Sequence, residues 1–163
     1  MEQKQEEICC PQFDPTGWDN KTYHWQEKIF IKKSIPQFMH MPFPPMVGKT
    51  IMSLWEAAQK AGAVNGLQDY LLLNRDPSPW VGEFYLAVNK EIAGMENVKI
   101  SGDFISKVYD GGYNEIPKFI KEMDNYLATQ NKKAKDYYFY YTTCPKCAKK
   151  WGHNYIVVFA QII

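Results

Sequence analysis

A carboxylate and a phenol stand two positions apart in a stretch that the sequence predicts to be a β-strand. Side chains of a strand alternate between its two faces, so within residues 82–89 Glu83 and Tyr85 share one face. The other face, with Phe84 and Leu86, suits packing under a helix. A carboxylate desolvated among aromatic rings would have a raised pKa and could act as a general base near neutral pH. On pattern alone, exposure of Glu83 at a sheet edge is an equally good alternative.

Other common catalytic patterns are not indicated. His24, His40 and His153 are too dispersed for a recognisable metal site or catalytic triad, and the chain has no Gly-x-Ser-x-Gly motif. Residues 48–50, Gly-Lys-Thr, match the end of a phosphate-binding loop, but position 43 is Phe where such a loop requires glycine. A serine or cysteine triad and a nucleotide site are therefore not expected.

Four cysteines form the second group of residues with chemical potential. Cys144 and Cys147 are separated by two residues at a predicted hairpin tip, a spacing that lets both sulfurs face one metal ion. A complete structural zinc site would need further ligands from Cys9 and Cys10 or from His153. The alternative is four reduced thiols at a contact between an N-terminal arm and the hairpin.

Aromatic residues are the most unusual part of the composition. They make up 15% of the chain, with eleven Tyr and five Trp. Residues 137–141 are all aromatic, and with residues 155–159 they predict the two arms of a β-hairpin. Because both faces of such a strand carry rings, one can belong to the core while the other lines a cleft. Rings with phenol hydroxyls suit a planar organic ligand.

Composition also limits the class of protein. Nineteen basic and eighteen acidic residues give a net charge of +1 over 163 residues, so neither nucleic acid nor a charged membrane is indicated as a partner. The polar start at residues 1–7 lacks the apolar run of a secretory signal, and no later stretch has the apolar length of a membrane-spanning helix. We expect a soluble, cytoplasmic protein.

The order of predicted elements divides the chain into an arm and two modules. Residues 1–29, broken by prolines and a glycine, predict an extended N-terminal arm. Residues 30–92 and 97–163 each predict a strand, a helix and two further strands within a single domain. We therefore expect an α+β fold in which the modules form a pseudo-two-fold antiparallel sheet, with helices on one face and a ligand cleft on the other. The helices are expected at residues 48–62 and 113–130.

Several short runs resemble the GyrI-like small-molecule-binding family. The similarity extends from Cys9 to Ile163 and is specific for its stand-alone subgroup, which includes hydrolases of cyclopropane-bearing DNA alkylators of the yatakemycin and duocarmycin type. The runs are Cys-Cys-Pro-Gln-Phe-Asp-Pro at 9–15, Trp18, Phe-Ile-Lys at 30–32, Tyr-Leu-Ala-Val at 85–88, Glu-Asn-Val at 96–98, Ser-Lys-Val-Tyr at 106–109 and Tyr-Thr-Thr-Cys-Pro-Lys-Cys-Ala-Lys-Lys at 141–150.

The resemblance implies a cleft that holds a flat polycyclic molecule and adds water across its cyclopropane ring without a catalytic cofactor. Glu83 would activate the water, and Tyr109 or another cleft tyrosine would protonate the oxygen that gains charge. The expected ligand-binding residues are Met39, Met41, Trp80, Tyr85, Tyr138, Tyr140, Trp151, Tyr155 and Phe159.

One departure from the family pattern weakens the interpretation of this chain as a simple sensor of cationic drugs. GyrI-like ligand sensors commonly carry a glutamate at the start of the final strand, where this chain has residues 153–155, His-Asn-Tyr. No helical DNA-binding pattern is found in residues 1–29. The alternatives to an enzyme are a non-catalytic module that sequesters hydrophobic or cationic drug-like molecules, and a protein whose aromatic face binds another protein.

Overall fold

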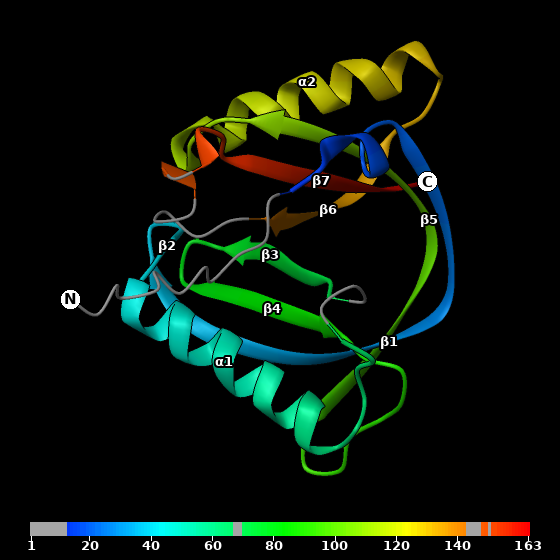
Figure 1. Cartoon of the computed structure of the whole chain (residues 1–163). Coiled ribbons are helices and arrows are strands. Elements are labelled where there is room, and N and C mark those ends of the chain that lie inside the picture. Colours follow the sequence, from blue (N-terminus) through cyan, green and yellow to red (C-terminus); the bar gives the residue numbers. More distant parts are fainter. Residues whose placement is uncertain (1–12, 67–69, 143–147, 150) are drawn as a thin grey trace, which may run out of the picture.

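The computed structural model describes residues 13–66, 70–142, 148–149 and 151–163 (Figure 1). Its strands follow the order β2-β1-β4-β3-β6-β7-β5, and β1 also pairs with β5, so the antiparallel sheet closes on itself. The elements are β1 (Lys21–Phe38), β2 (Met41–Pro42), α1 (Pro44–Lys60), β3 (Leu72–Ser78), β4 (Val81–Ala87), β5 (Glu96–Asp110), α2 (Ile116–Thr129), β6 (Ala134–Tyr141) and β7 (Tyr155–Ile162), with 3-10 turns at Pro15–Gly17 and Tyr113–Glu115.

Strand β1 joins the two halves of the sheet. It pairs with β4 through its second half and with β5 along most of its length, with a bulge between Trp25 and Lys28 where Glu27 takes a φ of 49°. Residues 21–29, predicted to be part of an extended arm, instead form the first half of this strand. Side chains that alternate in exposure and a free edge on β5 account for this difference.

Both helices cover the outer face of the sheet (Figure 1). Helix α1 begins at Pro44, earlier than predicted, because prolines are well tolerated in the first helical turn. It packs Leu54 and Ala58 over β1, β3 and β4, while α2 packs Phe119 and Met123 over β5, β6 and β7. None of the helices formed by the described residues is long and apolar enough to cross a membrane.

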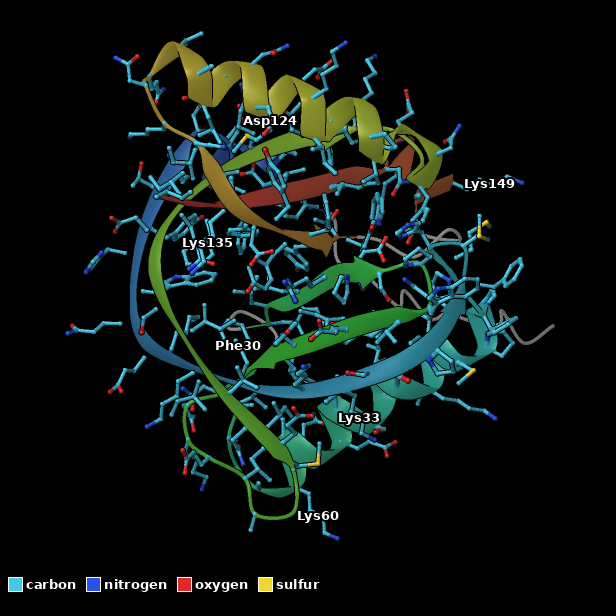
Figure 2. The ribbon with its side chains drawn as sticks, turned by 180° about the vertical axis from the view of Figure 1, so that it is seen from behind. Phe30, Lys33, Lys60, Asp124, Lys135 and Lys149 are labelled. Atoms are coloured by element: carbon cyan, nitrogen blue, oxygen red, sulfur yellow. The ribbon has the colours of Figure 1, made fainter. Side chains whose placement is uncertain are left out.

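The inside of the closed sheet is a separate aromatic core. Phe30, Phe104 and Phe159 are fully buried there, and Tyr85, Tyr138 and Tyr140 belong to the same cluster. Figure 2 shows Phe30 inside the ring of strands, whereas Lys33 lies on the α1 side, where its amine donates a hydrogen bond to Ser53. The period of two within β1 thus separates an inner core from the helix-covered outer face.

The observed architecture confirms an α+β fold with an antiparallel sheet and two helices on one side of it. The strand-helix-strand-strand order occurs in both halves, with the short β2 added in the first. Between the halves, β3 and β6 pair through Asn74 and Phe139. The pseudo-two-fold relation between the modules remains a prediction.

Candidate functional site

The inner face of β4 places a carboxylate within the closed sheet. Glu83 is 5% exposed and lies between Ser34 of β1 and Arg75 of β3 in the strand register. The Tyr85 hydroxyl, two residues further along the same face, donates a hydrogen bond of 2.5 Å to Glu83 Oε2. The predicted pairing of this carboxylate and phenol on one face is present, and Phe84 and Leu86 pack under α1 as expected.

Two cations complete the surroundings of Glu83. Lys32 Nζ lies 2.6 Å from Oε2, and Arg75 Nη1 donates to Oε1 at 3.0 Å. Arg75 also donates to Asp136 of β6 through Nε at 3.3 Å and Nη2 at 3.1 Å. This charged cluster, formed by Lys32, Arg75, Glu83 and Asp136, joins β1, β3, β4 and β6 across the inside of the sheet.

The cluster determines the protonation of Glu83. Burial acts to raise the pKa of Glu83, but hydrogen bonds from Lys32 and Tyr85, together with the charges of Lys32 and Arg75, lower it below its ordinary value. The raised pKa expected for a carboxylate among aromatic rings is therefore wrong, because the sequence did not reveal the two cations. Glu83 is ionised at neutral pH.

The phenol beside Glu83 keeps its proton. Burial and the negative charge of Glu83 raise the pKa of Tyr85 well above its ordinary range. Its ring lies 5.8 Å from that of Tyr138 and 6.3 Å from that of Phe30, both in edge-to-face geometry. Burial also raises the pKa of Tyr138. The charged cluster therefore borders an aromatic layer that carries protonated hydroxyls.

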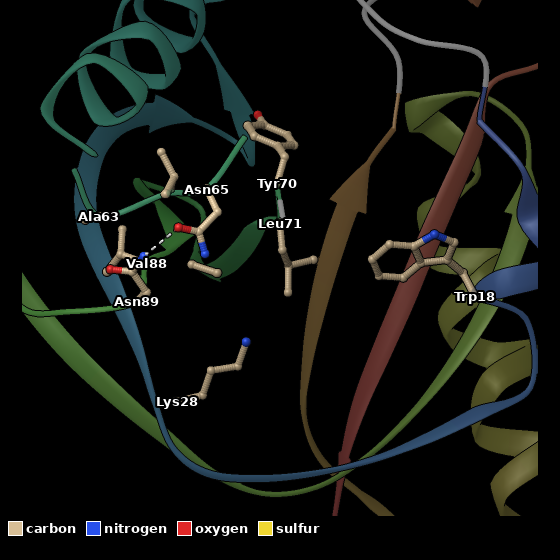
Figure 3. A pocket seen from close by; sticks show the side chains of 10 residues that line it. Trp18, Lys28, Ala63, Asn65, Tyr70, Leu71, Val88 and Asn89 are labelled. Carbon is tan, nitrogen blue, oxygen red and sulfur yellow. Dashed lines mark hydrogen bonds between the residues drawn. The ribbon is translucent and has the colours of Figure 1, made fainter. Parts of the chain in front are cut away.

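A cavity of about 360 Å³ lies at the other end of the inner face of β4 (Figure 3). Its lining includes Ala87 at the end of β4, Leu71 just before β3, Trp18 from the N-terminal segment and Lys28 from β1. A cavity of this volume is within the range of small-molecule sites. Residues 63–65 and 88–89 and Tyr70 form the rest of its lining.

Tyr109 lies on the opposite side of the sheet from Glu83. Its ring stacks on Phe119 of α2 at 4.8 Å, and its strand partner Ile156 belongs to the core under α2. Burial, with the negative charge of Glu122, raises the pKa of Tyr109 to about 12. The prediction that Tyr109 protonates a substrate held by Glu83 does not fit this placement, because the two side chains lie on opposite faces of the sheet. Which face a side chain takes depends on the register of its strand, since a shift of one residue exchanges the two faces.

The predicted ligand-binding residues fall into different parts of the molecule. Tyr138, Tyr140 and Phe159 face the inner core with Tyr85. Tyr155 contacts Phe13 at 5.8 Å and stacks on His153 at 4.9 Å at the end of β7.

Three predicted ligand contacts are not part of the inner core. Met39, Met41 and Trp80 are each more than half exposed, and the Trp80 ring contacts Phe38 at 5.8 Å. Met39 and Trp80 lie in hairpin turns and Met41 lies in the short edge strand β2, which accounts for their exposure. Trp151 is partly buried, with a buried indole nitrogen.

The predicted zinc site lies outside the part of the chain that the structure describes. Cys9, Cys10, Cys144 and Cys147 all belong to segments that are not described. Among the described residues, no group of three or more His, Cys, Asp or Glu side chains is arranged to hold a metal ion. The structural zinc therefore stays a prediction.

Sequence reasoning missed Lys32, Arg75 and Asp136 as part of the site. Lys32 and Arg75 contact Glu83 from the strands on either side of β4, and Asp136 of β6 joins the cluster through Arg75. The alternation within β1 did place Lys32 on the same face as the apolar Phe30, a pattern that could have marked a buried cation. Trp18, assigned only to an arm, lines the cavity.

Solved structures share this closed-sheet fold. The EcmrR C-terminal domain matches with a TM-score of 0.65 at 13% identity, covering 90% of this chain and 98% of that domain. An uncharacterized conserved protein from Listeria innocua matches with a TM-score of 0.63, and a hydrolase from Listeria innocua with 0.61, each at 11% identity over 89% of this chain and 92% of theirs. These likenesses fit the GyrI-like fold that the sequence resembles.

The family itself is shown by sequence. The bacterial hydrolase family model matches residues 1–162, so the chain belongs to that family. No curated protein matches the chain in sequence.

Proposed function

We propose that this protein is a hydrolase that opens the cyclopropane ring of flat, DNA-alkylating natural products and so detoxifies them. The observation that carries the proposal is the buried pair of Glu83 and Tyr85 at the border of an aromatic core. Membership of the bacterial hydrolase family supports a hydrolytic reaction, and the resemblance to the stand-alone GyrI-like subgroup supports this substrate class.

The proposed reaction needs one group to take a proton and another to supply one. Water attacks the strained ring carbon, the ring carbon–carbon bond breaks, and its electron pair moves through the conjugated dienone to the oxygen. Glu83, already ionised, accepts the proton that water loses. Tyr85 or Tyr138, both protonated, donates to the new phenolate oxygen.

The cations beside Glu83 have a defined part in this scheme. They keep the carboxylate ionised inside an apolar interior, and they offset the negative charge that develops on the substrate oxygen. They also weaken Glu83 as a base, because they lower its pKa. For Glu83 to contact water, the Lys32 amine, which is partly exposed, would have to move from Oε2.

Loss of the cyclopropyl chromophore of a duocarmycin-like compound tests the proposal. Wild-type protein should consume the compound catalytically, and Glu83→Gln should abolish turnover while it still binds the compound. Glu56→Gln, a charge loss at an exposed position of α1, is the matched control and should turn over at the wild-type rate. Unchanged turnover in Glu83→Gln would overturn the assignment of the base.

A second candidate function is binding without turnover, in which the protein sequesters hydrophobic drug-like molecules. The observation that favours it is that both carboxylate oxygens of Glu83 already have partners in Lys32, Tyr85 and Arg75. Such a fully paired carboxylate can be structural. Binding of the compound with no chromophore loss at enzyme excess would support sequestration and exclude hydrolysis of that compound.

A further inference from the structure

The cavity beside Trp18 differs chemically from the charged cluster around Glu83. In Figure 3 the Trp18 ring lies on one side of it and Leu71 on the other, and Ala87 and Val88 add apolar side chains to its lining. Asn65 and Asn89 stand at its rim, where the Asn89 amide donates to Asn65 Oδ1 at 3.5 Å (Figure 3). A ring wall, an aliphatic wall and rim amides suit a flat aromatic molecule with one polar end.

Lys28 gives this cavity its charge. Among the lining residues that the structure describes, Lys28 is the one charged side chain, and none of them is acidic. Its amine points into the cavity from β1 in Figure 3, with the nitrogen 5.8 Å from the Trp25 ring centre and 6.0 Å from that of Phe30. Within the described part of the chain, the ion pairs found do not include Lys28.

We infer that this cavity is a binding site for a flat aromatic ligand that carries a carboxylate, with the ring against Trp18 and the carboxylate at Lys28. A cation partly withdrawn from water, with no counter-charge among the described residues, gains most from an anionic partner. A cationic ligand would meet repulsion from the same amine. The site therefore selects anions, in contrast to a sensor of cationic drugs.

The site is separate from the proposed hydrolytic centre. Ala87, which lines the cavity, lies four residues from Glu83 on β4, a separation of about 13 Å along an extended strand. Between them, Phe30 and Leu73 are fully buried and Tyr85 is 5% exposed, so packed side chains fill the intervening core. The inference does not depend on hydrolysis at Glu83, and binding alone tests it.

Two probes with the same ring and opposite charge measure the selectivity. Titration of the whole protein with 2-naphthoate and with 2-naphthylmethylammonium at neutral pH and low salt should show tighter binding of the carboxylate by about tenfold. Lys28→Met keeps the aliphatic stem and removes the charge, so the ratio of the two dissociation constants should fall to near one. Lys121→Met, at an exposed position of α2, should leave the ratio unchanged.

A second variant tests the location. Val64 lines the cavity and is half-buried, so Val64→Trp should fill the space and weaken 2-naphthoate binding by tenfold or more. Circular dichroism would show that each variant remains folded. Equal affinities of the two probes for wild-type protein, an unchanged ratio in Lys28→Met, no binding of 2-naphthoate, or unchanged binding in a folded Val64→Trp variant would each overturn the inference.

Discussion

The Tyr85 hydroxyl donates a hydrogen bond of 2.5 Å to Glu83 Oε2, inside a closed sheet where both residues are about 95% buried. The two residues influence each other in opposite directions, since the hydrogen bond lowers the pKa of Glu83 and the carboxylate raises that of Tyr85. At neutral pH the proton therefore remains on the phenol and the charge on the carboxylate. Lys32 and Arg75 keep that charge stable in the interior.

Stability should depend on pH through Glu83. The pKa of Glu83 in the folded protein lies below the ordinary value of 4.5. The stabilisation of the folded state by ionised Glu83 is therefore fully present above pH 4.5 and is lost as the pH falls through the folded-state pKa. Glu83→Gln should cost about 1–2 kcal/mol of unfolding free energy at pH 7, because a buried partner of two cations is replaced by a neutral amide. The difference from wild type should shrink as the pH is lowered from 7 to below 4.5.

Urea denaturation across this pH range provides the measurement. Glu56→Gln, which changes an exposed carboxylate, should follow the wild-type curve in parallel. A difference between wild type and Glu83→Gln that stays constant from pH 7 to acid would contradict a lowered pKa for Glu83.

The hydroxyl of Tyr85 can be removed without removing its ring. Tyr85→Phe should raise the pKa of Glu83, because one of the hydrogen bonds that stabilise the carboxylate disappears, and should destabilise the protein by about 1 kcal/mol. Carbon NMR of the glutamate carboxyl groups during an acid titration measures this shift. Tyr23→Phe removes a hydroxyl from a partly buried ring that packs against the same core, and it should leave the Glu83 titration as in wild type. An unchanged titration in Tyr85→Phe would show that the hydrogen bond has no effect on the charge.

The fold near Glu83 was predictable because alternation along a strand is a local property. Glu83 and Tyr85 share the inner face, Phe84 and Leu86 share the outer one, and this follows from the period of two within residues 82–89. The helices were likewise indicated by their apolar periodicity. Local patterns, however, do not reveal which strands lie beside each other.

The features of the site that were not predicted depend on which strands pair, and local sequence patterns do not specify strand pairing. Lys32 and Arg75 reach Glu83 because β1 and β3 pair with opposite edges of β4. Their charges reverse the expected direction of the Glu83 pKa shift. Tyr109 lies under α2 because the register of β5 against β7 places it outward. Residues 21–29, read as irregular, become a strand because β5 offers them an edge.

The N-terminal segment should contribute to stability through Trp18. Its ring lies 5.4 Å from Tyr140 and 6.2 Å from Phe159, and its carbonyl accepts a hydrogen bond of 2.5 Å from Ser106. Trp18→Ala should lower the unfolding free energy by about 2 kcal/mol through lost ring contacts and buried area. Trp80→Ala, at a ring that is 56% exposed, should change it by less than about 0.5 kcal/mol. Equal effects of the two changes in urea denaturation would contradict a structural role for Trp18.

Gly102 should be the most restrictive glycine of the sheet, because it takes a φ of 142° at the point where β5 faces the bulge in β1. Other residues rarely adopt this conformation, and an added Cβ would lie 2.9 Å from Gln161 Nε2, which donates to the Ser101 carbonyl. The amide can move, so backbone strain dominates, and Gly102→Ala should destabilise by about 1–2 kcal/mol. Gly48→Ala in α1 meets no atom within 4 Å and should stabilise by about 0.5–1 kcal/mol. Thermal unfolding compares the two variants, and an unaltered melting temperature in Gly102→Ala would contradict the strain.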